Sequence, residues 1–155
     1  MSSAQIWQTV STSFEGTLAI AGSIGSKLRG GEVIELVSDL GGGKTAFVRG
    51  LARGMGSHDN VRSPSFTLSN QYRAGKLTLY HFDFYRLSQP GIMRDELAEI
   101  LTDKAAVVAV EWADIVESVL PDERLTLTIK NTGEAERLFL ISYPATLAYL
   151  IPGNT

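Results

Sequence analysis

Cysteine is absent from this chain of 155 residues, and histidine occurs only at His58 and His81. The first absence excludes a disulfide framework and thiolate-bound zinc, and the second argues against a metal centre built from imidazoles. No run approaches the roughly 20 apolar residues that a membrane helix needs. The first residues also lack the basic segment and apolar core of a secretory signal. These absences favour a soluble, cytoplasmic protein with no membrane partner.

The chain also carries little net charge. Its 14 Lys and Arg residues and 17 Asp and Glu residues give a net charge of −3 at pH 7. Bulk electrostatic attraction to nucleic acid is therefore not expected. With 44% hydrophobic residues, a chain of this length can bury the core of one domain. We expect a single domain over residues 1–155, with no internal repeat and no interdomain linker.

The most informative segment resembles a phosphate-binding loop. Residues 38–45 read Ser-Asp-Leu-Gly-Gly-Gly-Lys-Thr; the apolar, β-branched run at 33–37 before them predicts a buried strand, and residues 45–52 have helical apolar spacing. Successive glycines let backbone N–H groups turn inward as an anion nest at the start of the helix. Lys44 would then reach the β- and γ-phosphates of a nucleotide, and the Thr45 hydroxyl stands where such loops ligate Mg²⁺.

Two carboxylates end apolar segments further along the chain. Residues 105–110 lead into Glu111, and residues 77–82 lead into Asp83. A buried strand would hold either acid at the carboxyl edge of a sheet, where a phosphate-binding loop needs a carboxylate near its metal. Either acid can hold Mg²⁺ directly or through water while the other orients the attacking water; the alternative is that each only caps a turn. We expect His81 to be a satisfied packing residue rather than a proton relay.

The remaining pattern predicts an α/β fold with a mixed parallel and antiparallel central sheet flanked by helices. Residues 66–73 and 77–82, joined by a turn with Gly75, predict an antiparallel hairpin. The other expected elements are helices at 14–28 and 94–101 and strands at 6–10, 105–110, 125–129 and 137–142. The Ser-Pro-Ser-Phe-Thr segment at 63–67 either senses a γ-phosphate or is an ordinary turn. Trp112 is either a core residue or the wall of a pocket.

Four motifs in the same order resemble the bacterial TsaE (YjeE) family, which are P-loop ATPases needed for the threonylcarbamoyladenosine modification of tRNA. The motifs are the loop at 38–45 with Arg-Gly-Leu at 49–51, Ser-Pro-Ser-Phe-Thr-Leu at 63–68, His-Phe-Asp-Phe-Tyr-Arg-Leu at 81–87, and Val-Glu-Trp at 110–112. The resemblance covers nearly the full length of the chain. This sequence departs from the family where Ser38, Gly42 and Ser65 replace Gly, Ala and Thr.

The resemblance implies ATP and Mg²⁺ as cofactors and assigns roles to single residues. Thr45 and Glu111 would contact the metal, and Asp83 would be a second acid able to do so. Lys44, Asp83 and Glu111 would serve the hydrolysis of ATP. The nucleotide-binding positions that it implies are Thr17, Asp39, Leu40, Gly41, Gly42, Gly43, Lys44, Thr45, Ser65, Trp112 and Arg137.

The resemblance also implies work within an assembly. A partner similar to TsaD, paired with one similar to TsaB, would carry out the transfer to tRNAs that read codons beginning with A. This chain would be their ATP-driven accessory protein, would hydrolyse ATP slowly, and would meet tRNA only through the complex. The phosphate-binding loop alone also permits a small-molecule kinase or a nucleotide-binding regulatory module without turnover. Direct RNA binding is the weakest interpretation, because no basic face or aromatic platform is visible.

Overall fold

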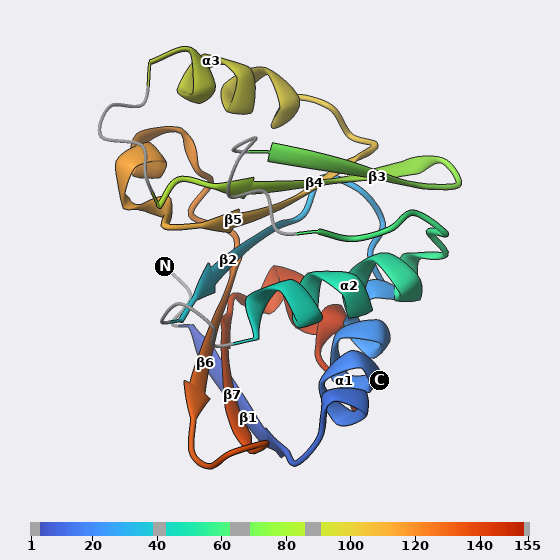
Figure 1. The fold of residues 1–155 in the computed structure, drawn as a ribbon. Helices are drawn as coiled ribbons and strands as arrows, with labels where there is room; N and C mark the ends of the chain where they lie inside the picture. Colours follow the sequence, from blue (N-terminus) through green and yellow to red (C-terminus); the bar gives the residue numbers. More distant parts are fainter. Residues whose placement is uncertain (1–3, 39–42, 63–68, 86–90, 154–155) are drawn as a thin grey trace.

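The computed structural model describes residues 4–38, 43–62, 69–85 and 91–153. These residues contain a seven-stranded sheet in the order β1-β7-β6-β2-β5-β4-β3, with helices on both faces (Figure 1). The predicted α/β class and the mixed sheet flanked by helices are therefore confirmed.

Four parallel strands form the middle of the sheet. In spatial order they are β6 (Leu125–Asn131), β2 (Val33–Val37), β5 (Ala106–Glu111) and β4 (Leu77–Asp83). Every residue of β5 is buried, as expected for the uninterrupted apolar run of a parallel strand that is covered on both faces. Because parallel strands share one carboxyl edge, Asp83 and Glu111 lie opposite each other in register. The fold thus brings together the two strand-end carboxylates that the sequence predicts.

Antiparallel strands extend the sheet to both edges. They are β3 (Ser69–Ala74) on one side and β7 (Arg137–Tyr143) followed by β1 (Gln5–Ser11) on the other. The hairpin of β3 and β4 is confirmed, and its turn contains Gly75 with a φ of +64°, a left-handed conformation that favours glycine. Residues 66–68, which we expected to begin the first hairpin strand, lie outside the described residues.

Within the described ranges, three α-helices cover the sheet: α1 (Phe14–Gly25), α2 (Lys44–Met55) and α3 (Gly91–Ile100). α1 and α2 pack side by side on one face, and α3 lies over the opposite face above β4 and β5 (Figure 1). Ser13 caps the N-terminus of α1, because its hydroxyl accepts a hydrogen bond from the Gly16 N–H. No helix in the described part of the chain has both the length and the apolar character to cross a membrane.

Two short 3-10 helices complete the described chain: η1 (Ala113–Val119) and η2 (Ala145–Leu150). The hydrophobic core forms a cluster on each face of the sheet. Along β5, Val107 and Ala109 enter the cluster beneath α1 and α2, whereas Val108 and Val110 enter the cluster beneath α3 and η1. The close packing on both faces fixes β5, and with it the position of Glu111.

Candidate nucleotide site

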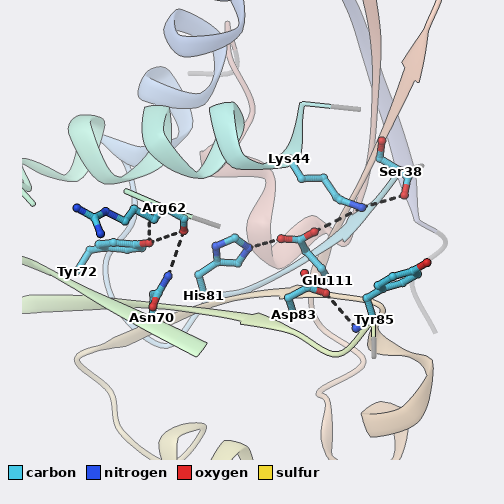
Figure 2. Close-up of polar contacts among 9 residues, drawn as sticks. All are labelled: Ser38, Lys44, Arg62, Asn70, Tyr72, His81, Asp83, Tyr85 and Glu111. Carbon is cyan, nitrogen blue, oxygen red and sulfur yellow. Dashed lines mark hydrogen bonds and ion pairs between the residues drawn. The ribbon is translucent and has the colours of Figure 1, made fainter. Parts of the chain in front are cut away.

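Lys44 is the first residue of α2, and its side chain extends across the carboxyl edge of the sheet. Its Nζ donates a hydrogen bond of 2.9 Å to the Ser38 carbonyl and lies 3.4 Å from Glu111 Oε1 (Figure 2). Gly43, just before α2, has a φ of +104°, a left-handed backbone conformation that glycine adopts without strain. The predicted loop residues Asp39, Leu40, Gly41 and Gly42 lie outside the described residues.

Glu111 ends β5 and is only 4% exposed. Both of its carboxylate oxygens have partners. Oε1 faces Lys44, and Oε2 accepts a hydrogen bond of 2.5 Å from His81 Nε2. Burial alone would raise the pKa of the Glu111 carboxyl, but the hydrogen bond with His81 and the charge of Lys44 outweigh burial and lower that pKa. Glu111 is therefore a carboxylate at neutral pH, held on a rigid strand.

Asp83 ends β4 beside Glu111, and its Oδ1 accepts a hydrogen bond of 3.0 Å from the Tyr85 N–H (Figure 2). Burial, the largest influence, raises the pKa of Asp83 and outweighs the opposing effect of the Tyr85 hydrogen bond. The negative charge of Glu111 adds to the increase. Two neighbouring carboxylates, one of them with a raised pKa, form a site whose charge a cation would stabilise.

The donor atoms at this edge suit Mg²⁺. Two carboxylates and the hydroxyl of Thr45, which follows Lys44 in the first turn of α2, are hard oxygen ligands of the kind that Mg²⁺ prefers. No group of three or more His, Cys, Asp and Glu side chains within the described residues could enclose a metal alone. That finding fits an ion that usually keeps several waters and binds through one or two carboxylates and substrate phosphates.

Trp112 follows Glu111 and forms part of a pocket wall rather than of the core. Its side chain is 41% exposed, and its φ of +57° makes it the one described residue other than glycine in the left-handed region. Its ring centroid lies 4.9 Å from that of Tyr85 and 5.4 Å from Lys44 Nζ. A cavity of about 120 Å³ is lined by Trp112 together with Lys44 and residues at the end of β2.

A second cavity, of about 180 Å³, lies at the start of α2 and includes Thr17, Gly43 and Arg137 in its lining. Thr17 is buried, and its hydroxyl lies 3.0 Å from the hydroxyl of Ser11. Arg137 Nη1 donates hydrogen bonds to three carbonyl oxygens of the turn between β6 and β7. The structure thus brings Thr17 and Arg137 to Gly43, in a cavity that shares none of its described lining residues with the one beside Trp112.

The chain that leads toward the expected phosphate-sensing segment is anchored at Arg62. The Tyr72 hydroxyl accepts a hydrogen bond from the Arg62 N–H and donates one to the Arg62 carbonyl, at 3.1 and 2.9 Å (Figure 2). Asn70 Nδ2 donates to the same carbonyl at 3.1 Å, and Arg49 of α2 donates to the Val61 carbonyl at 3.3 Å. Ser65, the predicted ligand in that segment, lies outside the described residues.

His81 is a functional candidate that the sequence analysis missed. The expectation that it is buried is confirmed, because its exposed fraction is 0%. The expectation that its polar atoms are satisfied is wrong, because Nδ1 has no hydrogen-bond partner among the described residues. The other ring nitrogen contacts Glu111. A signal existed: His81 and Asp83 are two residues apart on one strand and therefore share a face.

Comparisons with known proteins agree on one family. The family model described as threonylcarbamoyl adenosine biosynthesis protein TsaE matches residues 11–139. The tRNA threonylcarbamoyladenosine biosynthesis protein TsaE of Bacillus subtilis is 42% identical over 135 residues, which cover 84% of this chain and 80% of the relative. The protein of the same name from Treponema pallidum is 37% identical over 128 residues, with coverage of 83% and 94%. The crystal structure of YdiB from Bacillus subtilis superposes with a TM-score of 0.75 and 34% identity, over 92% of this chain and 88% of that one.

Proposed function

Because the chain belongs to the TsaE family of threonylcarbamoyl adenosine biosynthesis proteins, we propose that it acts in tRNA modification as an ATP-dependent accessory protein. It uses ATP with Mg²⁺ and hydrolyses ATP slowly in the cytoplasm. The transfer to tRNA is carried out by partners similar to TsaB and TsaD, so this chain meets tRNA only through their complex.

The buried contact between Lys44 and Glu111 is the observation that carries this proposal. Lys44 is 6% exposed and lies at the N-terminus of α2, where the helix dipole and free N–H groups favour an anion. The negatively charged partner of this lysine is the Glu111 carboxylate, whose Oε1 lies 3.4 Å from Lys44 Nζ. A nucleotide phosphate carries more negative charge and would draw Lys44 away from Glu111. The freed Oε1 of Glu111 would then face the metal, directly or through water.

The proposed hydrolysis is electrostatic. Lys44 and the N–H groups at the start of α2 stabilise the charge that develops on the γ-phosphoryl group, and Asp83 or Glu111 orients the attacking water. Mg²⁺, when bound by Thr45 and these carboxylates, neutralises further phosphate charge. Among the described residues, no arginine forms a hydrogen bond or an ion pair with Lys44, Asp83 or Glu111. That supports slow turnover by the protein alone and stimulation by its partners.

The proposed cycle couples ATP to docking. A nucleotide can shift the chain toward the docked state only if that state binds ATP more tightly than the free state does. Hydrolysis removes this preference and releases the chain from its partners. Val61 is bonded to Arg49 of α2 and Arg62 to Tyr72 of β3, just before the segment at 63–67 that would sense the γ-phosphate, which supports such a coupling.

Phosphate release from Mg·ATP tests the proposal. The purified chain is assayed alone and with the TsaB–TsaD-like pair from the same cell, beside Lys44→Ala, Glu111→Ala and the matched control Lys76→Ala in the exposed hairpin turn. We expect the pair to stimulate release, the two site substitutions to abolish that stimulation, and the Lys76 control to retain it. Formation of ADP that ignores the pair and requires an added small-molecule acceptor, with the γ-phosphoryl group transferred to that acceptor, would instead identify a kinase.

A further inference from the structure

His81 lies in the middle of the sheet, on β4, and none of its surface is exposed. A polar ring in such a place costs free energy unless its nitrogen atoms find partners, and an aliphatic side chain would fill the space at lower cost. Its Nδ1 has no partner among the described residues, whereas Nε2 points at Glu111 (Figure 2). Within the described part of the chain, the one polar contact of this ring is therefore the contact with Glu111.

The contact fixes which nitrogen atom of His81 carries the proton. A carboxylate only accepts hydrogen bonds, so Nε2 must carry the hydrogen atom and donate it to Glu111 Oε2. The hydrogen atom on Nε2 is therefore the atom that ties His81 to Glu111.

The two partners of Glu111 differ in how firmly they are held. Lys44 Nζ stands 3.4 Å from Oε1 at the end of a flexible side chain, and it also binds the Ser38 carbonyl. The His81 ring is 2.5 Å from Oε2 and comes from a strand that pairs directly with β5, with His81 opposite Ala109. Lys44 can leave the carboxylate by rotating its long side chain, whereas the fully buried His81 ring has only two side-chain bonds to rotate and is enclosed by packing.

We propose that His81 is a positioning residue that holds Glu111 in place after Lys44 has turned from the carboxylate to the phosphates. This inference rests on the proposed function, in which Lys44 exchanges the Glu111 carboxylate for a nucleotide phosphate. Without the Nε2 hydrogen bond, the freed carboxylate would rotate about its side-chain bonds, and its distance to the metal or the attacking water would vary. A misplacement of about 1 Å at a reacting group can cost about a hundredfold in rate.

Nitrogen-15 NMR spectra of the histidine rings test the hydrogen bond between His81 and Glu111 without any nucleotide. The full chain contains only two histidines, and the exposed His58 serves as an internal reference. We expect the His81 ring to carry its proton on Nε2 in the unsubstituted chain and in Lys44→Ala, and that proton to exchange rapidly only in Glu111→Ala. Loss of the protected Nε2 proton in Lys44→Ala would show that His81 does not hold Glu111 by itself, and would overturn the inference.

Turnover of Mg·ATP with the partner pair tests the consequence. His81→Leu fills the space but cannot donate, whereas the amide of His81→Gln can donate to Glu111. We expect His81→Leu to lower kcat about tenfold or more with KM for ATP within about twofold, and His81→Gln to restore most of kcat. Parental kcat in His81→Leu, or equal losses in both variants with unchanged urea unfolding, would contradict a positioning role. If the unsubstituted chain releases no phosphate, the proposed function fails, and the ring spectra alone decide whether His81 holds Glu111.

Discussion

Among single residues, the site places two carboxylates side by side. The environment of Glu111 stabilises its charged form, whereas that of Asp83 does not. His81 and Lys44 stabilise the charge of Glu111, whereas Asp83 is buried beside that charge and has only the Tyr85 N–H as a hydrogen-bond partner among the described residues. The negative charge of Asp83 is therefore unfavourable until a cation arrives. A binding site commonly accepts such a loss of stability in exchange for affinity.

Replacing Asp83 by Asn should stabilise the metal-free protein. The folded state raises the Asp83 pKa above its ordinary value of 3.8, so the folded state binds the proton more tightly than the unfolded state does. The stability that this proton gives is fully present below pH 3.8 and is lost as the pH rises through the folded-state pKa. We therefore expect the advantage of Asp83→Asn in urea unfolding with EDTA to grow above pH 3.8 and then to level off.

The same substitution should weaken the use of magnesium. We expect Asp83→Asn to raise the Mg²⁺ concentration needed for half-maximal phosphate release by about tenfold or more. Asp95→Asn on the exposed side of α3 is the matched control and should change neither property. A variant of Asp83 that is less stable than the parent at pH 7 without metal would contradict the assigned environment.

At the scale of elements, the crossing of α1 and α2 depends on glycine. A Cβ added at Gly50 would stand 2.5 Å from the Ala21 Cβ and 2.8 Å from the Leu18 carbonyl oxygen, which is closer than atoms can pack. A Cβ at Gly22, on the facing helix, would meet only the Gly50 carbonyl oxygen at 3.7 Å, an ordinary contact. The interface therefore has room for a side chain at Gly22 but not at Gly50.

Urea unfolding of two alanine variants checks this difference. Gly50→Ala should destabilise the protein by about 1–3 kcal/mol, because overpacking exceeds the gain in helix propensity. Gly22→Ala should stabilise it by about 0.4–1 kcal/mol, because the unfolded chain loses freedom and the helix gains a better residue. Equal effects of the two substitutions would show that the helices do not cross as described.

The elements also show what local patterns can and cannot predict. The strands were predictable because their apolar runs alternate or are continuous over five to seven residues, but η1 and η2 are too short to carry a helical period. The helix predicted at 14–28 ends at Gly25, where a Cβ would lie 2.3 Å from the Leu51 carbonyl oxygen. Beyond Gly25 the Lys27 and Leu28 N–H groups bond to the Ile24 and Gly25 carbonyls in tighter, 3-10-type turns, which the apolar spacing alone does not distinguish from an α-helix.

The candidate site was also predictable only in part, because strand ends are visible in the sequence and strand pairing is not. Asp83 and Glu111 could be found because each ends an apolar strand, and that position is visible in the sequence. The contact between His81 and Glu111 depends on the pairing of β4 with β5, and no local pattern fixes that register. Trp112 could be found as a motif residue, but its role as a pocket wall depends on its left-handed φ and on the exposure that follows.

At the scale of the whole molecule, the described chain is tied together across its length. The buried Glu32 carboxylate accepts hydrogen bonds from the N–H groups of Arg29 and Gly30, at 2.8 and 2.7 Å. The Tyr149 hydroxyl of η2 donates to the same carboxylate at 2.6 Å, so the last helix is joined to the loop between α1 and β2. The described residues share one sheet with a core on each face; the single domain over residues 1–155 stays a prediction.

The two tryptophans can test that prediction. Trp7 lies on the edge strand β1, and Trp112 lies at the carboxyl edge of the sheet beyond β5. We expect single-tryptophan variants, Trp7→Phe and Trp112→Phe, to report one cooperative transition whose midpoint in each variant coincides with that of its circular dichroism. A fluorescence midpoint that precedes the loss of secondary structure in one variant alone would indicate a separately unfolding part.

We propose that Lys44 and Glu111 form a nucleotide site in which a phosphate replaces the carboxylate as the partner of the lysine. Calorimetric titration of Mg·ATP into the unsubstituted chain and into Lys44→Ala measures whether this exchange occurs. We expect saturable binding by the unsubstituted chain and binding at least about tenfold weaker in Lys44→Ala, the loss expected for one contact to a charged group. No binding by the unsubstituted chain, or equal affinity in both proteins, would contradict it.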